Sequence, residues 1–353
     1  MIKVLVVDDS PVAREFLTHI FNSDPDLQVI GAAKDGEEAV KAVLDLQPDV
    51  ITMDIHMPKM DGFEATLRIM ETRATPIVMV SATSTVREVT TAFRALEAGA
   101  LAIVPRPMGI GAPEYETTVR ELVQTVKLMS EVKVVRRLPR DRKERVLSAD
   151  AVRKTVPTAA EMKIVAVGSS TGGPMVIKTI LSRLPKEFSV PLLIVQHIAT
   201  GFLNGFVEWL DNSSNLRVHV ASHGEYILPG HVYFAPDELH MGVNANDRII
   251  LSSDQAENNL RPSVSYLFRS VAHVYGKNAM GVLLTGMGKD GAQELKMMRE
   301  KGAVTIAQDK ESSIVFGMPG EAVNLDAAMH VLPPEGIALL LKTLGMRKTG
   351  IPE

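Results

Sequence analysis

A glycine-rich segment at residues 168–174 has the spacing of a turn that exposes a nucleophilic serine. It reads GSSTGGP, follows the apolar run 164–167 and precedes a pattern typical of a helix. The G-x-S-x-G spacing places Ser170 at a sharp strand-to-helix turn, where its hydroxyl stands exposed. The alternative is a glycine-rich phosphate loop at a helix N-terminus. The lysine of a P-loop is missing and Pro174 lacks an amide donor, but the motif alone leaves both interpretations open.

Two further polar residues follow apolar runs that predict strands. His197 comes just after the run 192–195, and Asp290 comes shortly after the run 279–284. A hydroxyl, an imidazole and a carboxylate beyond the ends of strands form the set that serine hydrolases use. With Ser170, these residues predict a catalytic triad.

The triad interpretation assigns a role to each side chain. His197 takes the proton from Ser170 Oγ, and Asp290 fixes the imidazole tautomer and stabilises the imidazolium. The backbone amides of Thr171 and Met287, in glycine-rich turns, are candidates for binding the oxyanion. A lone histidine or aspartate at a strand end is more often structural. The coincidence of all three residue types favours catalysis.

Three aspartates follow two apolar runs near the start of the chain. Asp8 and Asp9 follow the run 2–7, and Asp54 follows the run 50–53. Carboxylates that converge in one cleft repel each other unless a cation lies between them, and oxygen ligands suit Mg²⁺. A single aspartate at a strand end is often only a helix cap. The full set favours a magnesium site.

Residues 1–125 alternate short apolar runs with amphipathic helical patterns. The runs are apolar throughout, which is typical of parallel strands buried on both faces. They lie at 2–7, 29–33, 50–53, 77–80 and 100–104. We expect a five-stranded, doubly wound, flavodoxin-like parallel sheet with its ligands at the carboxyl ends of the strands. Ser81 and Arg106, which follow the last two runs, belong to the same edge.

Residues 162–346 predict a second α/β domain. Its predicted strands are 164–167, 192–195, 231–235, 249–251, 279–284 and 304–307. Helical patterns between several of them indicate a mainly parallel sheet, with a β-hairpin in the region 216–251.

A basic segment at 126–161 separates the two predicted domains. Residues 133–154 contain nine Lys/Arg and three Asp/Glu. We interpret the segment as a solvated linker. A dock for an acidic partner or for nucleic acid is the alternative, although no aromatic residue lies among the charges to stack on bases.

Composition limits the remaining possibilities. A length of 353 residues indicates two domains, and 46% hydrophobic and 23% charged residues indicate a globular protein. The absence of cysteine excludes disulfides, zinc–thiolate sites and a cysteine nucleophile. A net charge of −4 gives no general reason to expect nucleic-acid binding. Without an apolar run of membrane length or a signal peptide, we expect a cytoplasmic protein.

The N-terminal motifs resemble the receiver domain of two-component response regulators. The resemblance rests on 4–9, VLVVDD, on 53–58, MDIHMP, and on 60–62, MDG. It implies that Asp54 is phosphorylated and that Ser81 responds to the phosphoryl group. It also implies that Asp8 and Asp9, with Asp54, hold Mg²⁺.

Two positions depart from the receiver pattern. Arg106 precedes Pro107 where the family has a phosphate-pairing lysine, and Ile103 replaces the usual aromatic residue of the fifth strand. Arginine keeps the charge but is larger and planar. We therefore expect a weaker or different conformational response to phosphorylation.

Nearly the whole chain except the linker resembles the CheB family, in which a receiver is fused to a chemotaxis receptor methylesterase domain. The matching segments are 168–174, 196–197, 261–264 and 284–291. The order Ser, His, Asp differs from the Ser–Asp–His order of α/β-hydrolases. Ser169 replaces the small apolar residue usual in the family, and the G-x-S-x-G spacing selects Ser170 over its neighbour.

The resemblance implies hydrolysis of glutamyl γ-methyl esters on the cytoplasmic helices of chemoreceptors, and deamidation of receptor glutamines. It implies Mg²⁺ in the receiver, no cofactor for the esterase reaction, and phosphorylation by a chemotaxis-type histidine kinase. An unphosphorylated receiver would cover the active site, with 126–161 as the hinge. We expect a monomer that neither inserts into membranes nor binds nucleic acid. The alternatives are a non-catalytic protein- or nucleic-acid-binding output domain and a small-ester hydrolase.

The remaining histidines are weaker candidates for a site. His219, His223, His231 and His240 form a minor alternative as metal ligands. His56, close to Asp54, is interpreted as tuning access to that aspartate.

Overall fold

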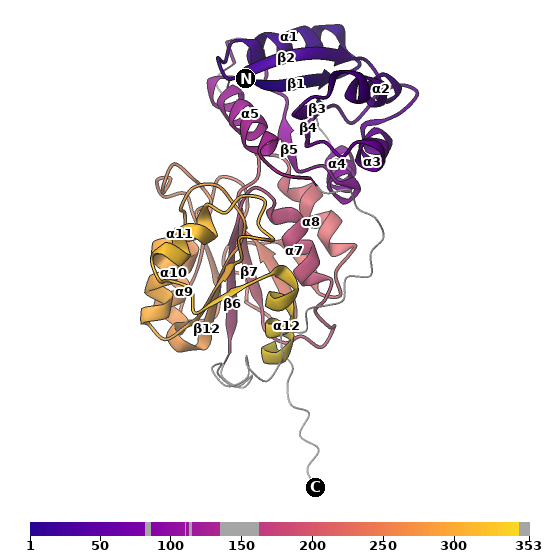
Figure 1. Ribbon diagram of the computed structural model, residues 1–353. Helices are drawn as coiled ribbons and strands as arrows, with labels where there is room; N and C mark the ends of the chain where they lie inside the picture. The colour runs from indigo at the N-terminus through magenta and orange to yellow at the C-terminus, as the bar shows by residue number, and fades with distance from the viewer. Residues whose placement is uncertain (82–85, 110, 113–114, 135–161, 346–353) are drawn as a thin grey trace. The chain divides into compact units, whose positions relative to one another are not determined.

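The computed structural model describes residues 1–345 except for 82–85, 110, 113–114 and 135–161 (Figure 1). The chain divides into two compact units, Met1–Lys143 and Glu144–Glu353, and each is described by itself. Most of the predicted linker 126–161 lies outside the described residues, and its first residues belong to a helix that ends at Ser130. The domain bounds 1–125 and 162–346 stay predictions.

The first unit is a five-stranded parallel sheet flanked by helices, as the sequence predicts. Its strand order is β2-β1-β3-β4-β5. The elements in chain order are β1 (Ile2–Val7), α1 (Pro11–Asn22), β2 (Leu27–Ala33), α2 (Gly36–Leu46), β3 (Val50–Met53), α3 (Gly62–Thr72), β4 (Ile77–Ser81), α4 (Val86–Ala98), β5 (Ala102–Pro105) and α5 (Tyr115–Ser130). The strand order reverses at β1 and β3, and sheets of this kind bind ligands beyond the carboxyl ends of the strands at such a point.

Side-chain caps start the helices that follow the first three strands. Each cap accepts the amide three residues further on: Ser10 from Ala13 at 3.4 Å, Asp35 from Glu38 at 3.0 Å and Asp61 from Glu64 at 2.8 Å. A cap satisfies an amide that has no partner within the helix. The turns at this edge of the sheet are therefore held at both ends, by a strand and by a capped helix.

The second unit is built on a seven-stranded sheet. Its order is β14-β13-β12-β6-β7-β9-β8, and all neighbouring strands are parallel. The strands are β6 (Ile164–Ser169), β7 (Leu192–Gln196), β8 (Arg217–Val220), β9 (His231–Phe234), β12 (Ala279–Leu283), β13 (Val304–Gln308) and β14 (His330–Leu332), with β10 (His240–Val243) and β11 (Ile249–Ser252) forming a separate antiparallel pair. The prediction of a mainly parallel α/β sheet with a hairpin is confirmed.

The hairpin is smaller than the predicted region 216–251. It contains only β10 and β11, because β8 pairs in parallel with β9 and forms the edge of the main sheet. β14, which the apolar pattern did not predict, forms the other edge. It has only three residues, too few to show the pattern of apolar residues by which a strand is predicted.

Helices cover both faces of the second sheet. They are α7 (Gly173–Leu181), α8 (Leu203–Asp211), α9 (Val264–Tyr275), α10 (Ala292–Glu300), α11 (Met318–Asn324) and α12 (Pro334–Gly345), with a 3₁₀ turn at Gly276–Asn278. Figure 1 shows α9, α10 and α11 on one face and α7, α8 and α12 on the other. The core against α9 includes Tyr233, Phe268 and Leu283, all fully buried.

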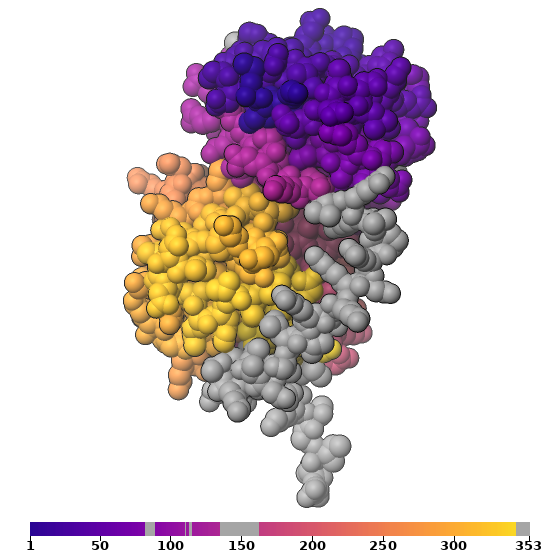
Figure 2. Space-filling model, in the orientation of Figure 1, coloured from indigo at the N-terminus to yellow at the C-terminus, as the bar shows by residue number. Residues whose placement is uncertain are grey.

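The C-terminal segment of this unit covers much of its visible surface. In the space-filling view, the yellow atoms of the last described residues occupy much of the visible face of this unit (Figure 2). Val323 on α11 and Leu339 on α12 are exposed. Within the described residues, no helix combines the length and the apolar character that a membrane span requires.

Candidate active site and acidic pocket

Ser170 lies in the turn between β6 and α7, where the G-x-S-x-G spacing places it. Its amide donates to the carbonyl oxygen of Thr285 at 3.0 Å, and its own carbonyl oxygen accepts the amide of Gly173 at 2.8 Å. Gly172 has a φ of +81°, a backbone conformation that residues with a side chain rarely adopt. A Cβ atom added to Gly286 would lie 2.6 Å from the Cβ of Ser170, so the turns after β6 and β12 touch.

The two adjacent serines have different environments. Ser169 is fully buried, and its hydroxyl donates to Oε1 of Gln196 at 2.6 Å. Ser170 is partly exposed. A nucleophile must meet its substrate, and a buried hydroxyl that already donates to an amide is badly placed to do so. The geometry therefore favours Ser170, as the motif spacing does.

His197 follows the strand next to that of Ser170. Ser169 pairs with Gln196 in the parallel ladder of β6 and β7, and the amide of His197 donates to the carbonyl oxygen of Ser169 at 2.9 Å. The Nε2 atom of His197 lies 3.1 Å from Oδ2 of Asp290. That contact is close, although its angle is not that of a hydrogen bond. The structure thus brings the three predicted residues to one edge of the sheet.

Asp290 lies in the turn between β12 and α10, and its side chain is buried against the N-terminus of α9. Its carboxylate accepts four hydrogen bonds: from Ser263 Oγ at 2.8 Å, Val264 N at 2.7 Å, Ser265 N at 3.2 Å and Asn258 Nδ2 at 3.2 Å. Burial pushes the pKa of Asp290 upward, but His197 and the donors of α9 outweigh it and hold the pKa below the usual range. The N-terminal end of a helix also favours a negative charge. The carboxylate therefore stays ionised.

Sequence reasoning did not assign a role to Ser263, Asn258 or Gln196. Ser263 caps α9 and contacts Asp290, and the only signal for it is its place in the segment 261–264. Asn258 lies in a turn after β11, distant in the chain from any motif.

The predicted oxyanion donors lie in the two turns that touch. The carbonyl oxygen of Thr171 accepts the hydroxyl of Thr285 at 3.0 Å, which links these turns. The amide of Gly286 donates to the carbonyl oxygen of Val315 at 3.0 Å, so it is not free to bind an oxyanion. Met287 follows it on the surface, with 40% of its area exposed. The assignment of the Thr171 and Met287 amides stays a prediction.

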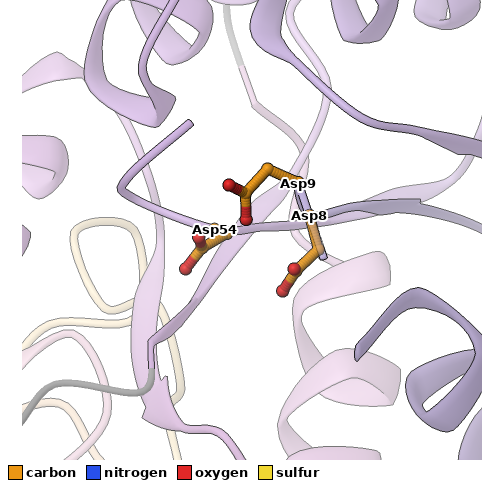
Figure 3. Close-up of side chains that lie close together, drawn as sticks. All are labelled: Asp8, Asp9 and Asp54. Carbon is orange, nitrogen blue, oxygen red and sulfur yellow. The ribbon is translucent and has the colours of Figure 1, made fainter. Parts of the chain in front are cut away.

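Three carboxylates converge at the carboxyl ends of β1 and β3. Asp8, Asp9 and Asp54 each place one carboxylate oxygen within 4.8 Å of the others (Figure 3). Asp8 and Asp54 are buried and Asp9 is exposed. Burial, followed by the charge of Asp8, raises the pKa of Asp54 to about 6, and Arg106 opposes the shift. Such an oxygen-only, electrostatically unfavourable cluster fits a hard divalent cation.

Arg106 contacts two of these aspartates. Its Nη2 lies 2.8 Å from Oδ2 of Asp8 and 3.3 Å from Oδ1 of Asp54. Its amide donates to the carbonyl oxygen of Ser81 at 2.8 Å. The structure therefore places Arg106 against Asp54, and the role of Ser81 stays a prediction. The other departure from the receiver pattern, Ile103, lies within β5.

The remaining histidines do not assemble a metal site. Nδ1 of His223 contacts the backbone of Leu251, and Nε2 of His219 contacts Glu225 at 2.7 Å. Within the part of the chain that the structure describes, the three aspartates are the only group of three or more possible ligands. His56 is exposed.

Two family models match the chain. The CheB methylesterase model matches residues 165–341, and the response regulator receiver domain model matches residues 4–112. A curated relative from Nitrosospira multiformis is 59% identical over 98% of this chain and 97% of its own length. The chain belongs to the CheB methylesterase family.

The names of two curated relatives and one solved structure describe what this chain is similar to. The Nitrosospira multiformis protein is named protein-glutamate methylesterase/protein-glutamine glutaminase. A Syntrophus aciditrophicus protein of the same name, numbered 1, is 57% identical over 98% of both chains. The solved structure of the Thermotoga maritima CheB methylesterase catalytic domain is 40% identical, covering 51% of this chain and 98% of its own with a TM-score of 0.49.

Proposed function

We propose that this protein is a phosphorylation-regulated serine hydrolase that demethylates glutamyl γ-methyl esters of chemoreceptors and deamidates receptor glutamines. The observation that carries the proposal is the contact of His197 with the ionised Asp290, beside the partly exposed Ser170. Membership of the CheB family and the names of its close relatives support the substrate class.

Acylation begins when Ser170 Oγ attacks the γ-carbonyl carbon of the substrate. Since Nε2 of His197 faces Asp290, the ring nitrogen available to Ser170 is Nδ1. Nδ1 takes the hydroxyl proton, and Asp290 stabilises the imidazolium that forms. The backbone amides of Thr171 and Met287 bind the oxyanion of the tetrahedral intermediate. On collapse the C–O bond to the methoxy group breaks, and the imidazolium gives its proton to the departing methoxy oxygen, which leaves as methanol.

Deacylation repeats the same steps with water. His197 takes a proton from the water as it attacks the acyl-enzyme, and returns that proton to Ser170 Oγ when the ester bond to the enzyme breaks. The product is a glutamate side chain. A glutamine side chain follows the same path with ammonia as the leaving group, because amide and ester share the tetrahedral intermediate. The esterase reaction needs no cofactor.

Asp54 is the proposed phosphoryl acceptor of the receiver. Receiver domains generally use Mg²⁺, and in this chain Asp8, Asp9 and Asp54 would hold it. When bound, the ion neutralises the acidic pocket and the charge of the phosphoryl group. The carboxylate of Asp54 attacks the phosphoryl group carried by a phosphohistidine of a chemotaxis-type histidine kinase, and the P–N bond to that histidine breaks. Arg106, whose Nη2 lies 3.3 Å from Oδ1 of Asp54, pairs with the product, and Ser81 is the second proposed partner.

Phosphorylation of Asp54 controls access to Ser170 in this proposal. The unphosphorylated receiver covers the active site, and the linker 126–161 acts as a hinge between two arrangements. The protein acts in the cytoplasm as a monomer, without binding nucleic acid or inserting into the membrane. A non-catalytic output domain is the alternative, but the gathering of Ser170, His197 and Asp290 has no purpose in such a domain.

Methanol release from a methylated chemoreceptor tests the proposed function. The wild type should release methanol, and Ser170→Ala should release at least 10³-fold less. Ser182→Ala, an exposed serine at the end of α7, is a matched control and should retain full activity. Unchanged release by Ser170→Ala would refute the nucleophile. Failure of the folded wild type to release methanol would favour the binding domain.

A further inference from the structure

A buried amide side chain joins the turn of the nucleophile to the turn of the base. Gln196, the last residue of β7, is 5% exposed. Its Nε2 donates to the carbonyl oxygens of Ser170 and His197, both at 2.8 Å. These bonds use both hydrogens of the amide group. One side chain therefore ties together the backbones of the two residues that exchange a proton in the proposed reaction.

Ser169 sets the orientation of that amide. Its hydroxyl donates to Oε1 of Gln196 at 2.6 Å, and the serine is fully buried. A flipped amide would turn Oε1 toward the carbonyl oxygens of Ser170 and His197, which carry no hydrogen to donate. The hydroxyl and the two carbonyl groups therefore select the same orientation.

The first turn of α7 closes tightly over the pair. A Cβ atom added to Gly173 would lie 2.2 Å from Oε1 of Gln196 and 2.9 Å from Oγ of Ser169. Backbone contacts tie the same two strands, because the amide of His197 donates to the carbonyl oxygen of Ser169 at 2.9 Å. The Gln196 side chain has little room for another rotamer.

We propose that Gln196, oriented by Ser169, is a positioning residue that fixes His197 relative to Ser170. It acts through the backbone and touches neither the substrate nor the proton in transit. The inference rests on the proposed function for its methanol-release readout, but it also predicts the intrinsic reactivity of Ser170. A misplacement of catalytic groups by about 1 Å can cost on the order of 10²-fold in rate.

Three variants test the proposal in the full-length protein. Gln196→Met keeps the length of the side chain but removes its hydrogen bonds, and Ser169→Ala removes only the hydroxyl. The double variant combines both changes. For each, kcat and KM of methanol release are measured. A second measurement is the rate constant for irreversible modification of Ser170 by a fluorophosphonate, with the folded fraction taken from thermal unfolding.

Gln196→Met should lower kcat and the modification rate by about 10²-fold with little change in KM. Ser169→Ala should lower both by about tenfold, and the double variant should be no slower than Gln196→Met, because the hydroxyl acts through the amide. Ser270→Ala is the matched control. Its hydroxyl accepts the amide of Val243 at 3.2 Å and donates to the carbonyl oxygen of Leu267 at 3.0 Å, so neither bond involves Ser169 or Gln196. Its loss should leave both rates unchanged.

The proposal would be overturned if Gln196→Met and Ser169→Ala lowered only the thermal stability and kept the wild-type kcat and modification rate. The pair would then have only a structural role. Independent, additive losses in the double variant would overturn the role of Ser169. Modification of Ser170 without methanol release by the wild type would refute the proposed substrate, while the modification rates of the variants would still decide the positioning role. Absence of modification at Ser170 would refute both.

Discussion

Nε2 of His197 lies 3.1 Å from Oδ2 of Asp290, and the same oxygen accepts the amide of Val264 at 2.7 Å. The carboxylate thus belongs to the proposed triad and to the first turn of α9 at once. Its pKa is held below the usual range, against the effect of burial, by these donors and by His197. The N-terminus of α9 favours the negative charge of Asp290 and holds the carboxylate in place. The carboxylate in turn holds the imidazole of His197.

Replacing Asp290 with asparagine should nearly abolish the esterase reaction. The amide can no longer stabilise the imidazolium or select the correct tautomer, so we expect a loss of about 10⁴-fold in kcat for methanol release. The variant also turns an NH₂ group toward the donors of α9, so its unfolding temperature should fall. Asp247→Asn, whose carboxylate binds the hydroxyl of Tyr275 at 2.7 Å, is a control that should keep wild-type kinetics. A loss of less than tenfold in Asp290→Asn would contradict the triad.

A charge placed at Asn258 should shift the pH profile of the enzyme. Its Nδ2 lies 3.2 Å from Oδ1 of Asp290, in a turn where Asn258 and Asn259 both have positive φ. Asn258→Asp adds a second negative charge near the His197–Asp290 pair and stabilises the imidazolium. Since the base must be neutral to act, we expect the acid limb of kcat/KM to move to higher pH by about one unit.

Asn259→Asp is the matched control for that shift. It adds the same charge to the same turn with a similar backbone conformation, where aspartate is tolerated. The nearby acids Glu257 and Glu294 both lie against Arg269, which balances them in either variant. Equal shifts in Asn258→Asp and Asn259→Asp would show a long-range effect of charge, without a specific contribution from the contact with Asp290.

Asp54 should make the stability of the receiver depend on pH. Its pKa in the folded state is raised from 3.8 to about 6, first by burial and then by Asp8. Between these values the folded state binds a proton that the unfolded state has lost, so stability falls as pH rises through about 4 to 6. Asp54→Asn removes this dependence and should raise the unfolding temperature of the receiver at pH 8 in EDTA, with a smaller difference at pH 4.

Added Mg²⁺ should reverse the comparison. If the three aspartates hold the ion as proposed, Mg²⁺ stabilises the folded wild type by mass action, whereas Asp54→Asn lacks one of the ligands. Thermal unfolding at pH 8 with and without Mg²⁺ measures both effects. An equal rise for wild type and Asp54→Asn would contradict the assignment of Asp54 as a ligand.

Arg106 should limit the response to phosphorylation. Its guanidinium reaches both Asp8 and Asp54, at 2.8 and 3.3 Å, and it is larger and more rigid than the lysine that it replaces. We expect Arg106→Lys combined with Ile103→Phe to increase the stimulation of methanol release by acetyl phosphate. An unchanged ratio of stimulated to basal rate would count against this role, and Asp54→Asn in the same background should show no stimulation.

The amino-acid sequence by itself determined the βα order and most strands, and it predicted the triad. Strands buried on both faces are apolar throughout, so the runs 50–53 and 164–167 are visible without a structure. Parallel strands also bring their carboxyl ends to one edge, which is why Ser170, His197 and Asp290 could be predicted to meet. The apolar runs and the polar residues that follow them are close together in the chain, so the sequence alone reveals them.

The tertiary structure alone decided that β8 joins the main sheet in parallel, which confines the hairpin to β10 and β11. It also showed that Ser169 is engaged with Gln196, and that Asn258 touches Asp290. These contacts join residues 27 and 32 positions apart. A serine or an asparagine has the same local pattern whether or not such a partner exists, because the partner is supplied by chain folding and not by neighbours in the sequence.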